Sequence, residues 1–128
     1  MEDIRFLLVD DRADVRAALR RLISTWPGGN VVAEAENGED ALRLVALHRP
    51  HIVFMDIVMP VMDGFQAAEQ MKTLYPDLRI VLYTGHSKER FQQRARDVGI
   101  DAVYMKEELT LSEFQRLLSQ WFNTSPQM

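Results

Sequence analysis

The sequence contains no cysteine, which excludes disulfide bonds and thiolate metal sites. It also lacks any apolar run near the roughly 20 residues that a membrane-spanning helix needs. Acidic Glu2 and Asp3 stand where a secretory signal peptide would carry basic residues. We therefore expect a cytoplasmic protein that does not insert into a membrane.

A surplus of positive charge is missing as well. The 128 residues carry a net charge of −4, whereas a protein that grips nucleic acid needs a basic surface to meet the phosphate backbone. We therefore expect no nucleic-acid binding by this segment, a statement that does not extend to any further domain on its C-terminal side. Hydrophobic residues at 47% and charged residues at 27% are typical of one globular domain with a real core.

Short apolar runs alternate with segments of helical periodicity along the whole chain. Strands are predicted at Arg5–Val9, Val31–Ala35, Ile52–Asp56, Arg79–Tyr83 and Ala102–Met105. Helices are predicted around the apolar stripes Val15–Ile23 and Ala41–Ala46, over Gly64–Leu74 and Lys88–Val98, and around Phe114–Trp121. Five such β-α units imply a parallel sheet with helices on both faces.

The chain reads as one domain over residues 1–122. The polar, helix-breaking segment 123–128 is predicted to be a tail or the start of a linker. Two helix starts carry capping signals: Asp63 precedes the third helix, and Thr110 with Glu113 forms a candidate capping box for the fifth.

The residues that follow the strands carry the chemistry, because ligands of an open parallel sheet bind beyond the carboxyl ends of its strands. Asp10 and Asp11 follow the first strand, and Asp56 ends the third. Thr84 follows the fourth strand and Lys106 the fifth. We therefore expect three carboxylates, a hydroxyl and an ammonium group at one edge of the sheet.

This set of groups suits a metal ion and a phosphoryl group. Three carboxylates that face one another repel unless a cation lies among them, and oxygen ligands without histidine or cysteine favour Mg²⁺. Beside such an ion, a lysine neutralises phosphoryl oxygens, a threonine donates a hydrogen bond, and a carboxylate can attack phosphorus. Asp56 is the candidate for the attacking carboxylate.

These motifs resemble the receiver domains of two-component response regulators over about residues 4–122. The resemblance rests on Asp10-Asp11, on "FMDIVMPVMDG" around Asp56, on Thr84-Gly85 and on "GIDAVYMK", which ends in Lys106. Each motif is weak alone, and all of them in order at successive strand ends are specific. The resemblance implies a flavodoxin-like, doubly wound α/β fold with five parallel strands in the order 2-1-3-4-5 and five helices.

The resemblance also implies roles. Asp56 is the expected phosphoacceptor, supplied by a sensor histidine kinase or a histidine phosphotransfer protein. Asp11, Asp56 and the backbone carbonyl of Val58 are expected to ligate Mg²⁺ directly, and Asp10 mainly through metal-bound water. Apart from catalysing its own phosphorylation and slow autodephosphorylation, such a domain is a signalling switch and not an enzyme. The apolar Val58 offers no side chain to orient an attacking water, which predicts a fairly long-lived aspartyl phosphate.

The switch residues depart from the family pattern. Thr84 and Lys106 are expected to hold the phosphoryl oxygens, and in the family an aromatic ring three positions before the lysine turns into the space that the threonine leaves. Here Val103 stands at that position and Tyr104 follows it. Because adjacent strand residues point to opposite faces, Tyr104 is not a simple replacement for the missing ring. Thr84, Val103 and Tyr104 are the switch candidates.

The last segment gives an indication of the output. "KEELTLSEFQRLL", with Glu107 where many members have proline, resembles the branch of the family that carries C-terminal helix-turn-helix domains. Transcription regulation through DNA bound by such a further domain is therefore implied. The family commonly forms homodimers through the fourth helix, fifth strand and fifth helix, and commonly docks the phosphotransfer partner on the first helix.

Two other functions stay open at this point. Haloacid dehalogenase-type phosphatases also attack with a strand-end aspartate, but they need a second acid two residues later, where this chain has Val58. A non-phosphorylated pseudo-receiver that serves as an interaction module is disfavoured by the intact set of site residues and kept open by Val103. Taken singly, Asp10 and Asp11 are also ordinary capping residues for the first helix.

Overall fold

A computed structural model describes residues 3–85 and 88–122, and strands and helices alternate in it as the sequence predicts. The strands are β1 (Ile4–Val9), β2 (Gly29–Ala35), β3 (Ile52–Asp56), β4 (Arg79–Thr84) and β5 (Ala102–Met105). The α-helices are α1 (Ala13–Ile23), α2 (Gly38–His48), α3 (Gly64–Leu74), α4 (Gln92–Val98) and α5 (Leu111–Phe122). The predicted tail at 123–128 lies outside the described residues.

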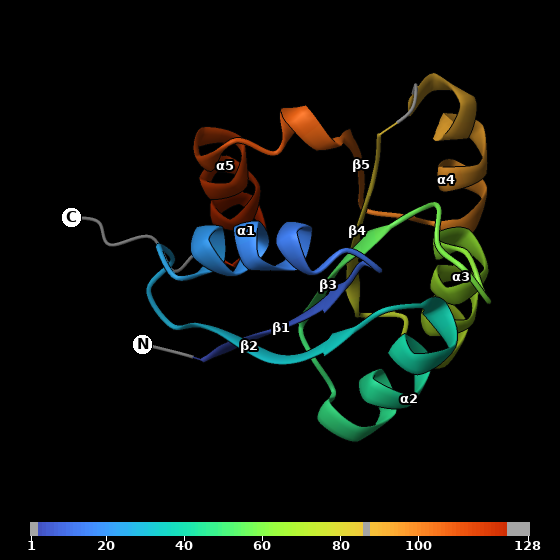
Figure 1. Cartoon of the computed structure of the whole chain (residues 1–128), viewed down its shortest axis with the longest axis horizontal. Coiled ribbons are helices and arrows are strands. Elements are labelled where there is room, and N and C mark those ends of the chain that lie inside the picture. The colour runs from blue at the N-terminus through green and yellow to red at the C-terminus, as the bar shows by residue number, and fades with distance from the viewer. Residues whose placement is uncertain (1–2, 86–87, 123–128) are drawn as a thin grey trace.

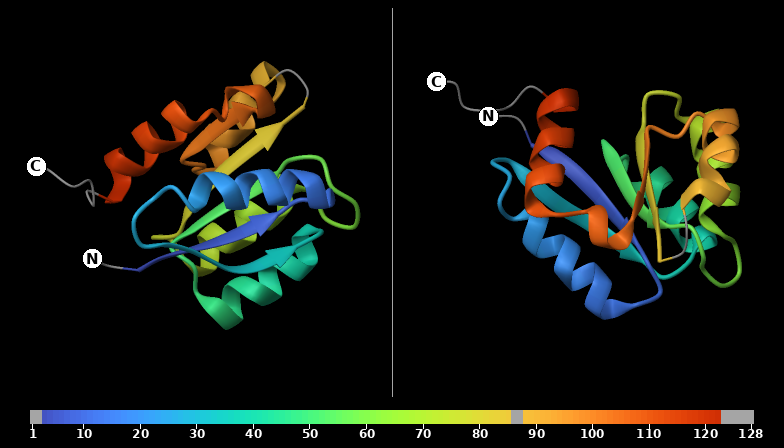
Figure 2. Two further views of the ribbon diagram at one scale, coloured as in Figure 1. Left: turned by 60° about the vertical axis from the view of Figure 1, so that its left-hand side comes forward. Right: turned by 90° about the horizontal axis from the view of Figure 1, so that it is seen from above.

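All neighbouring strands are parallel, and their order in the sheet is β2-β1-β3-β4-β5. Figure 1 shows α1 and α5 on one face of the sheet and α2, α3 and α4 on the other, and both views in Figure 2 agree. The predicted doubly wound fold and its strand order are therefore confirmed.

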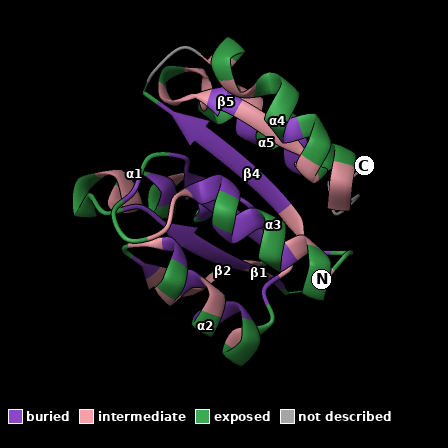
Figure 3. Cartoon of the chain, turned by 90° about the vertical axis from the view of Figure 1, so that its right-hand side faces the viewer, coloured by how far each residue is buried: buried purple, intermediate pink, exposed green. Residues whose placement is uncertain are grey.

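The core consists of two hydrophobic clusters, one on each face of the sheet. Side chains alternate between them along each strand, so that in β1 Leu7 faces α2 and α3 whereas Leu8 faces α1 and α5. The central strands are buried along their length (Figure 3), and every residue of β3 is buried, Asp56 included. A carboxylate at the end of such a strand is therefore enclosed by the fold.

Two of the predicted caps have clear geometry. The Asp63 carboxylate accepts the backbone N–H of Gln66 at 2.8 Å, and the Gln66 side chain accepts the N–H of Asp63 at 3.0 Å, which completes a capping box at α3. At α5, the Thr110 hydroxyl accepts the N–H of Glu113 at 3.2 Å, but the N–H of Thr110 donates to the carbonyl of Glu108 at 2.9 Å, so only half of the predicted capping box is formed. Both helices thus begin where the sequence places their first turn.

Two predicted boundaries differ from the structure by two residues or more. The segment predicted as one helix over Lys88–Val98 begins with a 3₁₀ turn, Lys88–Phe91, and becomes α-helical only at Gln92, where no side chain caps the first turn. The second strand begins at Gly29, two residues earlier than predicted, because its residues pair with β1 back to Ile4 across an irregularity between Phe6 and Leu7. Within residues 3–85 and 88–122, no helix has the length and apolar character of a membrane span.

Strand pairing brings the candidate residues level with one another. Val9 pairs with Met55, so the residues that come next, Asp10 and Asp56, lie side by side. Asp56 itself pairs with Tyr83. Thr84 pairs with Met105, which places Lys106 just beyond it. The sheet therefore presents the predicted groups along one edge.

Candidate functional site

Three carboxylates meet at the carboxyl edge of the sheet. Asp10, Asp11 and Asp56 each offer an oxygen atom, and these atoms all lie within 4.8 Å of one another. Asp10 is fully buried and Asp56 is 5% exposed, whereas Asp11 is exposed. Such a group of oxygens, open to solvent on one side, is suited to a hard cation.

Asp56 has a distinct neighbour at each oxygen. The Lys106 ammonium lies 3.6 Å from Oδ2, and the N–H of Val58 donates to Oδ1 at 3.2 Å. Burial, and after it the charge of Asp10, raises the pKa of Asp56, and Lys106 opposes that rise. Added positive charge among the acids would therefore favour the ionised form of Asp56.

Thr84 completes the set from the next strand. It ends β4 fully buried, in register with the residue before Lys106. Val58 lies in the loop after β3 with its side chain exposed. The structure thus brings Asp10, Asp11, Asp56, Thr84 and Lys106 to one edge, as expected, and their individual roles stay predictions.

Gly64 explains the Asp-Gly pair in the loop after β3. A Cβ atom at this position would lie 2.5 Å from the backbone oxygen of Asp56, closer than any side chain can approach. The N–H of Gly64 also donates to the carbonyl of Ile57 at 2.8 Å. Glycine therefore lets the first turn of α3 lie directly against the backbone of Asp56 and fix its position.

Asp10 does not cap α1 in the manner that the sequence left open. The N-cap of α1 is Arg12, and no side chain makes a capping hydrogen bond there. Asp10 instead accepts the N–H of Arg12 at Oδ1 (2.9 Å) and the hydroxyl of Tyr83 at Oδ2 (2.8 Å). The Asp10 carboxylate is thus held on both sides by residues of its own loop and of β4.

Tyr83 is the site residue that sequence reasoning missed. The strand pattern marked it only as the last apolar residue of "RIVLY", yet its hydroxyl reaches across β3 to Asp10 while the ring is 1% exposed. Burial, and after it the charge of Asp10, raises the pKa of Tyr83 far above its usual range, so the hydroxyl stays a donor. A tyrosine at the carboxyl end of a central strand was the available signal, because a buried hydroxyl needs a partner.

The two candidate switch residues lie on opposite faces of the sheet. Val103 contacts the cluster beneath α2, α3 and α4, and Tyr104 belongs to the cluster beneath α1 and α5. The Tyr104 hydroxyl donates to Oε2 of Glu113 at 2.5 Å, and burial followed by this contact raises the pKa of Tyr104 to about 12. The expected alternation is confirmed, and the Tyr104 ring is directed toward α5.

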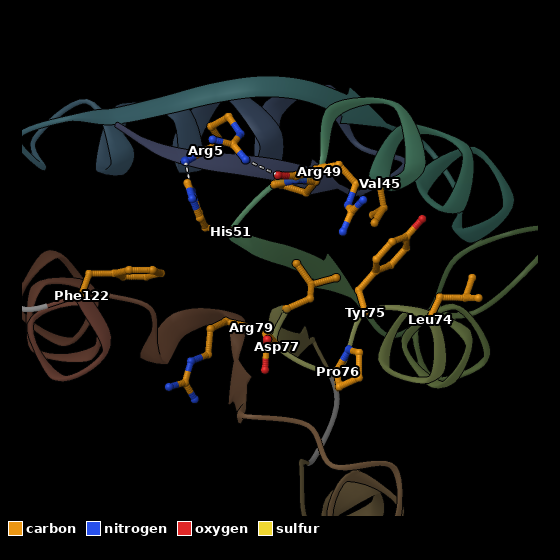
Figure 4. Close-up of a pocket in the computed structure, with 12 residues that line it drawn as sticks. Arg5, Val45, Arg49, His51, Leu74, Tyr75, Pro76, Asp77, Arg79 and Phe122 are labelled. Carbon is orange, nitrogen blue, oxygen red and sulfur yellow. Dashed lines mark hydrogen bonds between the residues drawn. The ribbon is translucent and has the colours of Figure 1, made fainter. Parts of the chain in front are cut away.

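A separate hollow of about 380 Å³ lies at the opposite, amino-terminal edge of the strands (Figure 4). Its basic groups engage their neighbours: Arg5 donates from Nη2 to the Arg49 carbonyl at 2.6 Å, and the Arg49 guanidinium lies 4.4 Å from the centre of the Tyr75 ring. The nitrogen Nδ1 of His51 accepts the backbone N–H of Arg5. This hollow is therefore stabilised by internal contacts and lies far from the acidic cluster along the strands.

A doubly wound sheet with an acidic cluster, a lysine and a threonine at its carboxyl edge defines a class of phosphorylation-dependent signalling domains, and the comparisons agree. The family model described as "Response regulator receiver domain" matches residues 6–118. The chain belongs to this family.

Several of the similar proteins are named as response regulators. The chain is 34% identical over 103 residues to the response regulator protein VraR of Staphylococcus saprophyticus, which covers 80% of this chain and 49% of VraR. It is 33% identical to the response regulator GacA of Pseudomonas aeruginosa, covering 93% of this chain and 55% of GacA. The chain thus spans about half the length of these relatives.

Solved structures show the same fold. The signal receiver domain of NarL from Mycobacterium tuberculosis superposes with a TM-score of 0.86 at 27% identity, covering 98% of this chain and 100% of that domain. A two-component response regulator of the LuxR family from Aurantimonas sp. gives a TM-score of 0.82 at 31% identity, covering 92% of this chain and 86% of the other. Two similar proteins are named as transcriptional regulatory proteins, and a solved structure at 31% identity is named as a response regulator of the LuxR family.

Proposed function

We propose that this receiver domain accepts a phosphoryl group on Asp56 in a Mg²⁺-dependent reaction and acts as a phosphorylation switch. The donor is a sensor histidine kinase or a histidine phosphotransfer protein. The observation that carries the proposal is one arrangement: Asp10, Asp11 and Asp56 within 4.8 Å of one another, with the Lys106 ammonium 3.6 Å from Asp56.

The residues present fit Mg²⁺. The donor set contains only oxygen atoms. Burial and the neighbouring carboxylate of Asp10 raise the pKa of Asp56, and a bound cation would relieve the repulsion between the two carboxylates. Asp11, Asp56 and the Val58 carbonyl would hold the ion directly, and Asp10 would hold its bound water. When bound, the ion neutralises part of the charge on the phosphoryl oxygens.

The chain's own side chains then perform the transfer. A carboxylate oxygen of Asp56 forms a bond to phosphorus while the bond from phosphorus to the donor histidine breaks, and the electron pair returns to the imidazole nitrogen. The Lys106 ammonium compensates negative charge on the phosphoryl oxygens, and the Thr84 hydroxyl donates a hydrogen bond to one of them. Hydrolysis of the same bond by water returns the domain to its starting state.

A hollow of about 290 Å³ beside the site supports a phosphotransfer partner that docks on the first helix. It lies between α1 and the segment that precedes α5, and both Lys106 and Tyr83 reach its wall. Its other lining residues are Asp14, Val15, Ala18, Leu19, Leu22 and Leu109. A partner seated here would bring its histidine close to Lys106 and the acidic cluster.

The alternatives fit the site less well. A haloacid dehalogenase-type phosphatase needs an acid at the position of Val58, whose side chain is apolar and exposed. A pseudo-receiver that is not phosphorylated does not require five site residues at one edge of the sheet. A chain of the CheX–CheY complex with BeF₃ and Mg²⁺ from Borrelia burgdorferi has a TM-score of 0.83 and 25% identity to this chain, which supports the proposal that a domain of this fold works with Mg²⁺.

The remaining proposals concern the whole protein. Residues 1–122 form the receiver domain, which acts in the cytoplasm and forms homodimers through α4, β5 and α5. DNA is contacted by a further domain, since two relatives are named as transcriptional regulatory proteins and the match covers only 44% and 49% of their length. Autophosphorylation and slow autodephosphorylation are the only reactions that the domain catalyses.

Incubation with acetyl phosphate and MgCl₂, followed by intact mass spectrometry, tests the proposal. We expect the unchanged chain to gain the mass of one phosphoryl group in MgCl₂. We expect no gain when EDTA replaces MgCl₂, and no gain in Asp56→Asn. A gain that survives Asp56→Asn, or no gain by the unchanged chain, would contradict it. Steady turnover of a phosphate monoester would instead favour the phosphatase.

A further inference from the structure

We infer that Tyr83 is a positioning residue that fixes the Asp10 carboxylate for water-mediated binding of Mg²⁺, an inference that rests on the proposed function. Tyr83 does not reach the phosphoryl group in this role. It acts through Asp10, and the juxtaposition that assigns the role is the 2.8 Å hydrogen bond from its hydroxyl to Oδ2 of Asp10.

Both oxygens of Asp10 have a fixed donor. Oδ1 accepts the backbone N–H of Arg12 at 2.9 Å, and Oδ2 accepts the Tyr83 hydroxyl. Rotation of the carboxylate breaks at least one of these bonds, so its plane is set. Each oxygen keeps one lone-pair direction for a further donor, which suits water bound to a metal ion.

Tyr83 is rigid enough for this task. Its ring is 1% exposed, and its hydroxyl also lies 3.5 Å from the carbonyl of Val9, the residue before Asp10. Its own carbonyl accepts the N–H of Ile57, the residue after Asp56, at 2.9 Å. The same residue therefore ties the side chain of one acid to the backbone beside another and couples their positions.

Packing alone does not require the hydroxyl. Tyr83 belongs to the hydrophobic cluster beneath α1 and α5, which also contains Phe6, Phe54 and Phe114. A phenylalanine would fill the same space, and the oxygen of Tyr83 is bonded to the acidic site instead of to another core residue. The polar atom is explained by Asp10 and not by the core.

The hydrogen bond also divides the work among the acids. Donation to Asp10 withdraws part of its charge and reduces repulsion within the cluster. Asp10 is buried and held from both sides, so it is suited to contact the metal ion through metal-bound water. Asp11 is exposed and able to bind a cation directly. Groups that orient a ligand in this manner typically change metal affinity by about 10- to 100-fold when removed.

Calorimetric titration of the metal-free protein with MgCl₂ tests the inference. We expect Tyr83→Phe to weaken Mg²⁺ binding about 10-fold. Tyr104→Phe is the matched control, because it also removes a buried tyrosine hydroxyl bonded to a carboxylate, that of Glu113, but on the α5 side. We expect its affinity to stay within about twofold of the unchanged chain. Equal affinity of Tyr83→Phe and the unchanged chain overturns the inference.

A double-variant cycle shows whether Tyr83 acts through Asp10. In an Asp10→Ala background, Tyr83→Phe should produce no further loss of Mg²⁺ affinity, because the group it orients is gone. If Tyr83→Phe lowers Mg²⁺ affinity in the Asp10→Ala background as much as it does in the unchanged chain, the assignment is contradicted. It is also contradicted if Tyr83→Phe unfolds the protein whether or not Asp10 is present. Near-ultraviolet circular dichroism on each variant reports the integrity of the fold.

The inference and the proposed function fail in different ways. If the unchanged chain binds Mg²⁺ and Tyr83→Phe binds it weakly while acetyl phosphate leaves Asp56 unmodified, the positioning role stands and the phosphoacceptor proposal fails. If Asp56 is phosphorylated and Tyr83→Phe binds Mg²⁺ as the unchanged chain does, only the positioning role fails. Absence of Mg²⁺ binding by the unchanged chain overturns the positioning role.

Discussion

The ammonium group of Lys106 lies 3.6 Å from Oδ2 of Asp56, although fifty positions separate the two residues in the sequence. The contact is possible because β4 sets the level of the two strand ends: Tyr83 pairs with Asp56 of β3 and with Tyr104 of β5, and Thr84 pairs with Met105 of β5. Lys106 is the cation that lowers the pKa of Asp56 against burial and the charge of Asp10. Its removal therefore affects both the ionisation of Asp56 and the binding of phosphoryl oxygens.

Lys106→Met should slow phosphorylation by acetyl phosphate about 100- to 1,000-fold, because one charge-stabilising group is removed from the transition state. Lys88→Met is a suitable control, since Lys88 pairs with Glu108 at 3.0 Å and not with Asp56. Rates come from intact mass spectra taken over time at fixed MgCl₂. An equal effect of both substitutions would mean that the loss is due to disturbed loops and not to the charge beside Asp56.

Asp56→Asn should stabilise the metal-free protein at neutral pH. The folded protein holds the pKa of Asp56 above its unfolded value, so the stability that this residue contributes is present below the unfolded pKa of about 3.9 and is lost as pH rises through the folded pKa. Asp56→Asn removes the charge and therefore restores this stability at neutral pH. We expect Tm to rise by roughly 2–6 °C at pH 7, the shift that corresponds to about 1 kcal/mol in a domain of this size.

The same thermal melts contain their own controls. The difference in Tm between Asp56→Asn and the unchanged chain should vanish near pH 3, where both side chains are neutral. Saturating MgCl₂ at pH 7 should stabilise the unchanged chain and reduce or reverse the difference. A difference that is independent of pH would indicate altered packing and not relief of charge repulsion.

Most of the fold and the members of the acidic edge follow from local signals in the sequence. Asp10, Asp56 and Lys106 each follow an apolar run, and parallel strands bring such positions to one edge regardless of their distance along the chain. The strand order itself needed the family resemblance, because alternation of strands and helices is compatible with several orders. Asp63 was predictable because capping depends only on residues three positions apart.

Contacts between elements were less predictable. The bond from Tyr83 to Asp10 joins residues 73 positions apart and depends on the length of one side chain reaching past a strand. The 3₁₀ turn at Lys88–Phe91 has a pattern of apolar and polar residues that also fits an α-helix. It differs from an α-helix in the hydrogen bonding of its backbone, which that pattern does not reveal. Local periodicity contains no information about either feature.

Gly64→Ala should destabilise the fold by about 1–3 kcal/mol, because the added methyl group has to displace the Asp56 backbone that would lie 2.5 Å away. Phosphorylation should fall as well, since Asp56 is moved. Gly85→Ala is the matched control for stability: among the residues that the structure describes, no atom lies within 4 Å of a Cβ at Gly85. Urea denaturation measures both variants, and equal stability of the two would show that the loop after β3 yields without cost.

Val58→Asn should shorten the lifetime of the aspartyl phosphate. Val58 lies two residues after Asp56, with its side chain 53% exposed and its N–H donating to Asp56. We therefore expect its side chain to border the face from which water attacks phosphorus. Valine excludes water there, whereas an amide can hold a water molecule by a hydrogen bond. We expect autodephosphorylation about 100-fold faster, the lower end of the range for one positioned polar group. The measurement is the decay of the phosphorylated mass after removal of acetyl phosphate.

Val58→Thr tests shape against polarity, because it keeps the branched form of the side chain and replaces one methyl group by a hydroxyl. Equal decay in all three chains would show that the residue at position 58 does not control the attacking water.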